Sequence, residues 1–243
     1  MEISLYIDTC GLGSPSSANW YLSREIEVQR LYYILGGTGQ YAISDGKMCP
    51  FHPGCLYLFP YNLRDHFVSS ETDPIRHLYF DFLSTPPIVA SAPLCCPVPE
   101  TSPLRQAISL TEQILLQSPG LHLFKEPLRT QLLQLILTLM DDRQPIPYSA
   151  DCAVCQTLHT IQTRYYEKLT VSGLALEAGF EENYFIRRFR SVMGLTPYAY
   201  LRNYRLMQAR RLLSTGVSLT DAANLVGYET PASLSRALRG GCG

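Results

Sequence analysis

The sequence of 243 residues lacks the long apolar runs that membrane-spanning helices need. A spanning helix takes about 18 or more uninterrupted apolar residues, whereas the strongest candidate, LLQLILTLM at 132–140, is interrupted by Gln134 and Thr138. The N-terminal stretch MEISLYIDTC has neither the basic segment nor the long apolar segment of a secretion signal. Since 46% of the residues are hydrophobic, which is ordinary for a packed core, we predict a soluble, cytoplasmic protein.

Signatures of catalysis are also missing from the sequence. The stretch GGTG at 36–39 lacks the G-x-G-x-x-G spacing of a nucleotide-binding loop and reads as a β-turn. No G-x-S-x-G pattern and no Cys/His nucleophile signature is present. We therefore predict no catalytic residue, no cofactor and no enzyme activity.

The eight cysteines do not indicate a disulfide framework, because that usually requires a secreted chain. Cys152 and Cys155 form a single C-x-x-C with no second pair at zinc spacing. Packing on a helix is the favoured interpretation of this pair, and a metal or redox role is the alternative.

Charge is distributed unevenly along the chain. Residues 1–150 carry nine Lys and Arg side chains against 14 Asp and Glu, a net charge of −5, whereas residues 151–243 carry 11 against 7, a net charge of +4. All but one of the 11 cations are arginine, Lys168 being the exception. This asymmetry suggests an anionic polymer as partner for the second part, with a solvated helical surface as the alternative.

The first 150 residues read as strands followed by helices. Short apolar runs bounded by Gly, Pro and Asp from about 20 to 85 favour a β-sandwich or barrel. The proline-rich stretch at 84–103 is expected to interrupt regular structure. Helical periodicity follows at 103–117 and 126–141. In the second of these helices, the leucine stripe from Leu128 to Leu139 is either core or a homodimer seam.

Two similar segments lie in the remaining part of the chain. LALEAGFEENYFIRRFR (174–190) returns as AANLVGYETPASLSRALR (222–239), with one residue added in the second turn. In each copy a glycine, Gly179 or Gly227, separates two helical patterns. Helix, short glycine turn and helix is the arrangement of a helix-turn-helix motif. Two copies predict a paired unit rather than a solenoid, which needs about three repeats or more.

Capping residues mark the ends of these predicted helices. Thr170 precedes the first short helix, and Ser218 with Asp221 has the spacing of a capping box. Thr230 followed by Pro231 supplies an N-cap and an N1 proline for the last helix. These residues therefore predict where the first helix of each motif begins and where the last helix begins.

A long helix is predicted between the two motifs. Thr196–Pro197 starts it and Gly216 ends it, which gives about 18 residues and a length of about 27 Å. Successive major-groove segments on one face of DNA are about 34 Å apart. A rod of this length, together with the bodies of the two motifs, can place two recognition helices one turn of DNA apart.

The region 157–239 resembles the AraC/XylS family of bacterial transcription regulators. The resemblance rests on GLALEAGF, on YFIRRFRSVMGLTPYAYLRNYRLMQARRLLSTG and on SLTDAANLVGYE. Its most specific part is G-x-[ST]-P-x-x-Y-x-x-x-x-R from Gly194 to Arg205, followed by Ala209 and Leu212–Leu213. The stretch at 31–67 and IRHLYFDF at 75–82 resemble the cupin-like effector domain of that family more loosely.

The resemblance implies an α+β fold in two domains. Residues 1–142 are expected to form a cupin-like β-barrel with trailing helices, which binds an effector and dimerises. A linker at 143–150 leads to an all-α domain at 151–243, in which a linker helix joins two helix-turn-helix motifs. Metal-binding cupins carry two histidines one residue apart; His52, His66 and His77 are separate here, so no metal site is predicted.

The resemblance implies an effector-responsive, sequence-specific transcription regulator that binds double-stranded DNA as a homodimer. An activator role is part of this expectation. RNA polymerase is a further candidate partner, and no association with a membrane is expected. The outward positions of the recognition helices give the predicted DNA contacts Glu182, Asn183, Ile186, Arg187, Arg190, Ala232, Ser235, Arg236 and Arg239. A sugar or other small ligand would stack against Trp20, Tyr32, Tyr33, His66 and Tyr79, with core packing as the alternative for each ring.

Some positions depart from the family pattern. Ala222 and Ser233 stand where larger residues are usual, Arg188 stands where an apolar residue is common, and Gly173 lies inside a helix. Family members usually have Phe-Gly, Ser-Pro and Tyr-Arg pairs after the second recognition helix. The last residues here, RALRGGCG, lack these pairs. Two other functions therefore stay open: a regulator-like protein with impaired DNA binding that acts through protein interaction and, less favoured, a cupin enzyme.

Overall fold

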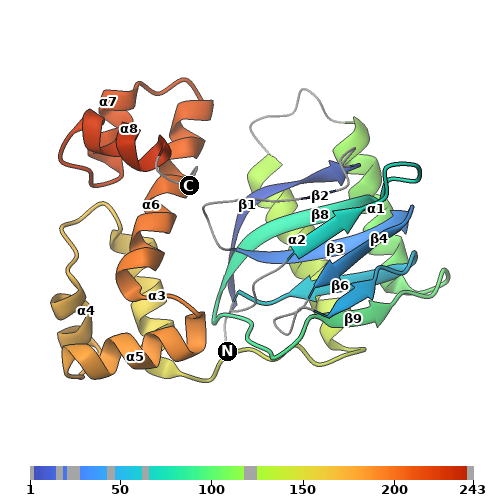
Figure 1. Cartoon of the computed structure of the whole chain (residues 1–243), viewed down its shortest axis with the longest axis horizontal. Coiled ribbons are helices and arrows are strands. Elements are labelled where there is room, and N and C mark those ends of the chain that lie inside the picture. The colour runs from blue at the N-terminus through green and yellow to red at the C-terminus, as the bar shows by residue number, and fades with distance from the viewer. Residues whose placement is uncertain are drawn as a thin grey trace. The chain divides into compact units, whose positions relative to one another are not determined.

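The computed structural model describes residues 3–14, 19–20, 28–42, 47–61, 66–117 and 125–239. The described residues up to Tyr148 form one compact unit, and those from Ser149 onward form a second (Figure 1). The first unit contains the strands and two helices, and the second is helical, which confirms the predicted α+β class. None of the helices in the described ranges combines the length and the apolar character needed to cross a bilayer.

The strands are β1 (Ser4–Gly13), β2 (Asn19–Trp20), β3 (Gln29–Gly36), β4 (Gly39–Ala42), β5 (Met48–Pro50), β6 (Cys55–Phe59), β7 (His66–Ser69), β8 (Arg76–Thr85) and β9 (Leu94–Pro97). The helices are α1 (Pro103–Gln117), α2 (Lys125–Asp141), α3 (Cys152–Arg164), α4 (Val171–Glu177), α5 (Glu182–Met193), α6 (Pro197–Ser214), α7 (Leu219–Leu225) and α8 (Pro231–Arg239).

The strands form two antiparallel sheets rather than one closed barrel. One sheet has the order β1-β8-β3-β6-β9 and the other β2-β7-β4-β5. Across β3 and β8, Leu31 pairs with Phe80 and Tyr32 pairs with Tyr79. Because successive side chains of a strand point to opposite faces, these two pairs lie on opposite sides of the first sheet. Both faces of β3 are buried, which explains its continuous apolar sequence.

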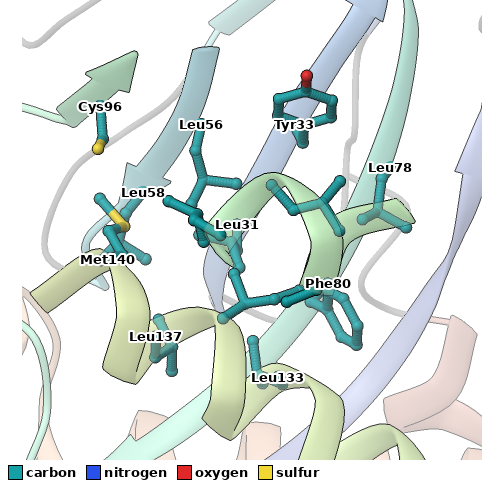
Figure 2. Packing of buried hydrophobic residues seen from close by; sticks show 14 of the residues in the cluster. Leu31, Tyr33, Leu56, Leu58, Leu78, Phe80, Cys96, Leu133, Leu137 and Met140 are labelled. Atoms are coloured by element: carbon teal, nitrogen blue, oxygen red, sulfur yellow. The ribbon is translucent and has the colours of Figure 1, made fainter. Parts of the chain in front are cut away.

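Helices α1 and α2 cover one face of the first sheet. Leu133, Leu137 and Met140 of α2 belong to one buried cluster with side chains of the sheet, and in Figure 2 Leu133 lies near Phe80 and Met140 near Leu58. The predicted bounds of α1, 103–117, are confirmed, and α2 begins one residue before the predicted position. Hydrophobic burial on this face therefore ties the helices to the strands.

The other face of the first sheet packs against the second sheet through aromatic rings. Ring centroids are 5.0 Å apart for Tyr41 and Phe51, for Phe51 and Tyr57, and for Phe59 and Phe67. Such tilted and edge-on pairs are the favoured geometry of aromatic contacts. The interior between the sheets is therefore built largely from aromatic side chains.

Two strands were not expected from the sequence. β1 lies before the predicted start near residue 20, and β9 lies inside the proline-rich stretch predicted to be irregular. β1 has a glycine, Gly13, at the position that pairs with His77 of β8. A larger residue would not fit there, because a Cβ on Gly13 would lie 2.5 Å from Cε1 of His77. β9 is an edge strand, where Pro97 costs no ladder hydrogen bond on the outer side.

The predicted linker at 143–150 belongs mostly to the first unit. Ile146 is buried in the core under the helices, and its N–H donates to Oδ1 of Asp141 at 2.6 Å. Tyr148 forms a β-bridge with Ile88. The division between the units therefore falls between Tyr148 and Ser149.

Candidate nucleic-acid interface

The first motif consists of α4, a turn at Gly179 and α5. Thr170 caps α4, since its Oγ1 accepts the N–H of Gly173 at 3.1 Å. Gly179 has φ +76°, a left-handed conformation that favours glycine. Phe185 and Phe189 are fully buried, as their i, i+4 spacing predicted. The opposite side of α5 is therefore turned to solvent.

The start of α5 is held by carboxylates. Glu181 caps the helix by accepting the N–H groups of Asn183 and Tyr184, both at 2.9 Å, and these bonds lower the pKa of Glu181. The side-chain amide of Asn183 donates to Glu181 at 3.1 Å, and Glu182 accepts the hydroxyl of Ser172 in α4. Glu182 and Asn183, both predicted DNA contacts, thus also bind within the motif.

The second motif repeats this plan with α7, Gly227 and α8. Ser218 caps α7 by accepting the N–H of Asp221 at 3.1 Å, and its hydroxyl donates to the Asp221 carboxylate at 2.6 Å. In a standard capping box the acidic side chain accepts the backbone N–H of the N-cap residue. Here the Asp221 carboxylate instead accepts the side-chain hydroxyl of Ser218. Thr230 caps α8 through the N–H of Ser233 at 3.1 Å. Leu234 is fully buried.

Helix α6 joins the two motifs, with α4 and α5 towards one of its ends and α7 and α8 towards the other (Figure 1). It has 18 residues, starts at Pro197 after the cap Thr196, and is followed by Gly216 with φ +88°, which confirms the predicted limits. The family-specific pattern thus marks real junctions, since Gly194 ends α5 with φ +76°. Tyr200 of the same pattern is buried.

Arg188 is an anchor that the sequence did not reveal. Its Nε donates to Oδ2 of Asp151 at 2.8 Å, and Nη1 donates to the Tyr184 hydroxyl at 3.1 Å. The guanidinium also lies 5.2 Å from the ring centroid of Phe180. Asp151 precedes α3, so this contact ties α5 to α3. No local pattern predicts a pair that is 37 residues apart in the chain.

The predicted DNA contacts lie on accessible parts of α5 and α8. Arg187, Arg190, Arg236 and Arg239 are exposed, and Ile186 and Ser235 are partly exposed. Glu182, Asn183 and Ala232 are exposed as well. Each recognition helix thus presents two arginines to solvent, the residue type that pairs with phosphates and guanine edges. The role of these residues in DNA binding stays a prediction.

Comparison with known proteins decides what the helical unit is. Residues 168–242 match the family described as a helix-turn-helix domain. This region is an AraC-type helix-turn-helix domain. The AraC-type domain contains both motifs and α6, and it begins in the turn before α4.

Proteins of known sequence match part of this chain. The helix-turn-helix-type transcriptional regulator YisR of Bacillus subtilis is 33% identical over 113 residues, which cover 45% of this chain and 39% of YisR. The transcriptional regulatory protein HptR of Staphylococcus aureus is 33% identical over 78 residues, 32% of this chain and 31% of HptR. The matches thus span less than half the length of these relatives.

Solved structures extend the likeness in fold beyond the AraC-type domain. ToxT from Vibrio cholerae matches 98% of this chain and 92% of its own with a TM-score of 0.60, at 9% identity. A second ToxT structure, with an unsaturated fatty acid bound, matches with a TM-score of 0.55 at 9% identity. At these identities the likeness concerns the fold, which is that of a sheet-rich unit followed by an AraC-type domain.

The predicted effector residues do not all face the same side. Tyr32 lies between the two sheets, where its ring is 5.0 Å from the ring of His77, and His77 is 5.6 Å from Tyr79. Tyr33 lies in the core under the helices, with the guanidinium of Arg105 5.3 Å from its ring centroid. One pocket therefore cannot be lined by both Tyr32 and Tyr33. The side chains of Trp20 and His66 lie outside the described residues.

Metal ligands do not cluster in the part of the chain that the structure describes. Within these residues, no three His, Cys, Asp or Glu side chains approach one another closely enough to hold a metal ion.

Proposed function

We propose that this protein is a sequence-specific, DNA-binding transcription regulator. The observation that carries the proposal is the pairing of two capped recognition helices, each with exposed arginines, at the two ends of α6. Helix α6 is about 27 Å long at 1.5 Å per residue, which suits two contacts one turn of DNA apart. Because DNA is the partner, we expect the protein to act in the cytoplasm.

Selection of binding sites from random duplex DNA tests this proposal. We expect enrichment of a site with two half-sites about 10 base pairs apart. Loss of all sequence preference at moderate salt would contradict a specific regulator. It would favour the alternative of a regulator-like protein that acts through protein interaction.

Arg187 is the side chain that we expect to read a base. Arg187→Ala should weaken binding to the selected site by ~1–3 kcal/mol and relax the preference at one base pair. Arg143→Ala, which removes an exposed arginine of the first unit, is the matched control and should leave affinity unchanged. If the Arg187 variant keeps full affinity and full preference, the assignment of this residue is wrong.

A small-molecule effector is the second part of the proposal. Its support is the fold shared with ToxT, which was crystallised with an unsaturated fatty acid. The aromatic interior near Tyr32 and Tyr79 suits either a sugar, through stacking, or an acyl chain, through apolar contact. Thermal unfolding with a panel of sugars and a panel of fatty acids distinguishes the two classes, since a bound ligand stabilises the folded state.

Homodimerisation is the third part. The stripe predicted from Leu128 to Leu139 divides between two environments: Leu132 and Ile136 are buried, whereas 37% of Leu128 and 43% of Leu135 is exposed. The exposed leucines of α2 are the residues that we expect at a dimer interface. Sedimentation of Leu135→Glu should show a weaker dimer than the unmodified chain. An RNA polymerase contact and activation remain predictions from family resemblance.

A further inference from the structure

The cysteine pair of the C-x-x-C lies in the first turn of α3. Cys152 is exposed, and Cys155 lines an open cavity of about 480 Å³ between α3 and α4. Sγ of Cys152 is 3.7 Å from the carbonyl oxygen of Ala150, and Sγ of Cys155 is 3.8 Å from that of Ser149. Since these carbonyls are consecutive, both thiols turn towards the same short segment, and both can be reached from solvent.

Helix geometry places two cysteines at this spacing close to disulfide distance but outside it. Residues three apart on a helix have Cβ atoms about 5–6 Å apart, whereas a disulfide needs about 3.5–4.5 Å. Bond formation would therefore require the first turn of α3 to tighten by roughly 1–2 Å. A disulfide that distorts its surroundings is easier to reduce than an unstrained one, which is typical of regulatory disulfides.

The residue that precedes this turn holds the recognition helix of the first motif. Asp151 accepts the N–H of Val154 through Oδ1 at 3.2 Å, which caps α3, and accepts Nε of Arg188 through Oδ2 at 2.8 Å. Arg188 lies on α5 between Arg187 and the buried Phe189. One carboxylate thus links the geometry of the cysteine turn to the position of α5.

We propose that Cys152 and Cys155 form a reversible disulfide that weakens the hold of Asp151 on Arg188 and so lowers the affinity of the protein for DNA. The effect on DNA rests on the proposed function, whereas the disulfide and its effect on α5 do not.

The chemistry needs an oxidant, for which a hydroperoxide is sufficient. The thiolate of Cys152 attacks the peroxide, an S–O bond forms as the O–O bond breaks, and water or an alcohol leaves after protonation. Cys155 then attacks this sulfenic acid, an S–S bond forms, the S–O bond breaks and water leaves with the proton of the second thiol. Two electrons pass from the thiols to the peroxide. Burial raises the pKa of Cys155 and so disfavours its thiolate, and Cys152 is the more exposed of the two thiols, so Cys152 is the one that meets the peroxide first.

Mass spectrometry of the full-length protein tests the disulfide itself. Trypsin cleaves after Arg143 and Arg164, so one peptide, 144–164, contains both cysteines and no other. After brief treatment with hydrogen peroxide, we expect this peptide to lose two hydrogen atoms and to resist alkylation until dithiothreitol is added. Cys152→Ser should remain alkylatable at Cys155. A peptide that stays fully reduced, or that proceeds only to higher oxides, overturns the proposal.

Amide hydrogen exchange and DNA binding test the consequence. Oxidation should speed exchange in 182–193 and weaken DNA binding about tenfold, equivalent to ~1.4 kcal/mol, with neither change in Cys152→Ser. Arg188→Met, which removes the contact without oxidation, should show the same faster exchange in both redox states. A disulfide that leaves exchange in 182–193 unchanged overturns the proposal. If the reduced protein binds no DNA, the proposed function fails, and the mass and exchange measurements still decide this inference.

Discussion

Arg205 of α6 donates a hydrogen bond from Nε to the carbonyl oxygen of Tyr165, 2.7 Å away. A second bond, from Nη2 to the carbonyl oxygen of Glu167, is also 2.7 Å long. Both carbonyls lie in the turn between α3 and α4. Burial lowers the pKa of Arg205, but a guanidinium keeps its charge in proteins. The last residue of the family-specific pattern therefore binds the turn that leads into the first motif to helix α6.

Replacing Arg205 with lysine should destabilise the AraC-type domain. A lysine has a single ammonium group and cannot reproduce the fork that binds two carbonyls. We expect a loss of ~1.5–3 kcal/mol in the free energy of unfolding, the range for hydrogen bonds to a charged group. Urea unfolding measures it, with Arg202→Lys on the same helix as the matched control. Equal stability of the two variants would contradict this role of Arg205.

The two motifs should differ in stability. In α5 three side chains, Phe185, Phe189 and Met193, are fully buried, whereas in α8 only Leu234 is, among the described residues. Since local stability follows buried apolar contacts, amide exchange should be faster in 218–239 than in 170–193. Arg236→Ala should also weaken DNA binding less than Arg187→Ala. Equal protection and equal losses would show that the second motif is as firm as the first.

Stability of the first unit should fall in mild acid because of His77. Burial lowers the pKa of this histidine to about 3, below its usual 6.5. Between these values the unfolded chain binds a proton that the folded chain does not, so stability rises with pH and is lost as pH falls. At pH 5 the loss relative to neutral pH should be up to ~2 kcal/mol.

Thermal unfolding at pH 7.5 and pH 5 measures this effect. The control is His77→Gln, which stays neutral and keeps a donor for the backbone bond to Gly13. The variant should lose less stability on acidification than the unmodified protein. Identical losses would show that other groups determine the acid sensitivity.

The end of the first unit can be tested with fragments. A fragment of residues 1–148 should fold without the AraC-type domain and bind no DNA. A fragment of residues 1–142 should be less stable, because it removes the buried Ile146 and the bridge between Tyr148 and Ile88. Loss of a buried isoleucine side chain costs ~2–5 kcal/mol. Circular dichroism during heating compares the two, and equal midpoints would place the boundary earlier.

Local signals in the sequence determined the helical unit well. Thr170, Ser218 and Thr230 were each expected to cap a helix, and each accepts a backbone N–H in the structure. The limits of α6, and those of α1 in the first unit, were also predicted correctly. Caps, proline at N1 and helical periodicity act over a few residues, so the sequence alone contains the information that sets them.

Only the tertiary structure decided the contacts between distant residues. Asp151 and Arg188 are 37 residues apart, and their pairing depends on how α3 packs against α5. Tyr32 and Tyr33 are neighbours with the same chemistry, yet the pleat sends one between the sheets and the other under the helices. The sequence names these residues, but which surface each one meets depends on the packing of whole sheets and helices.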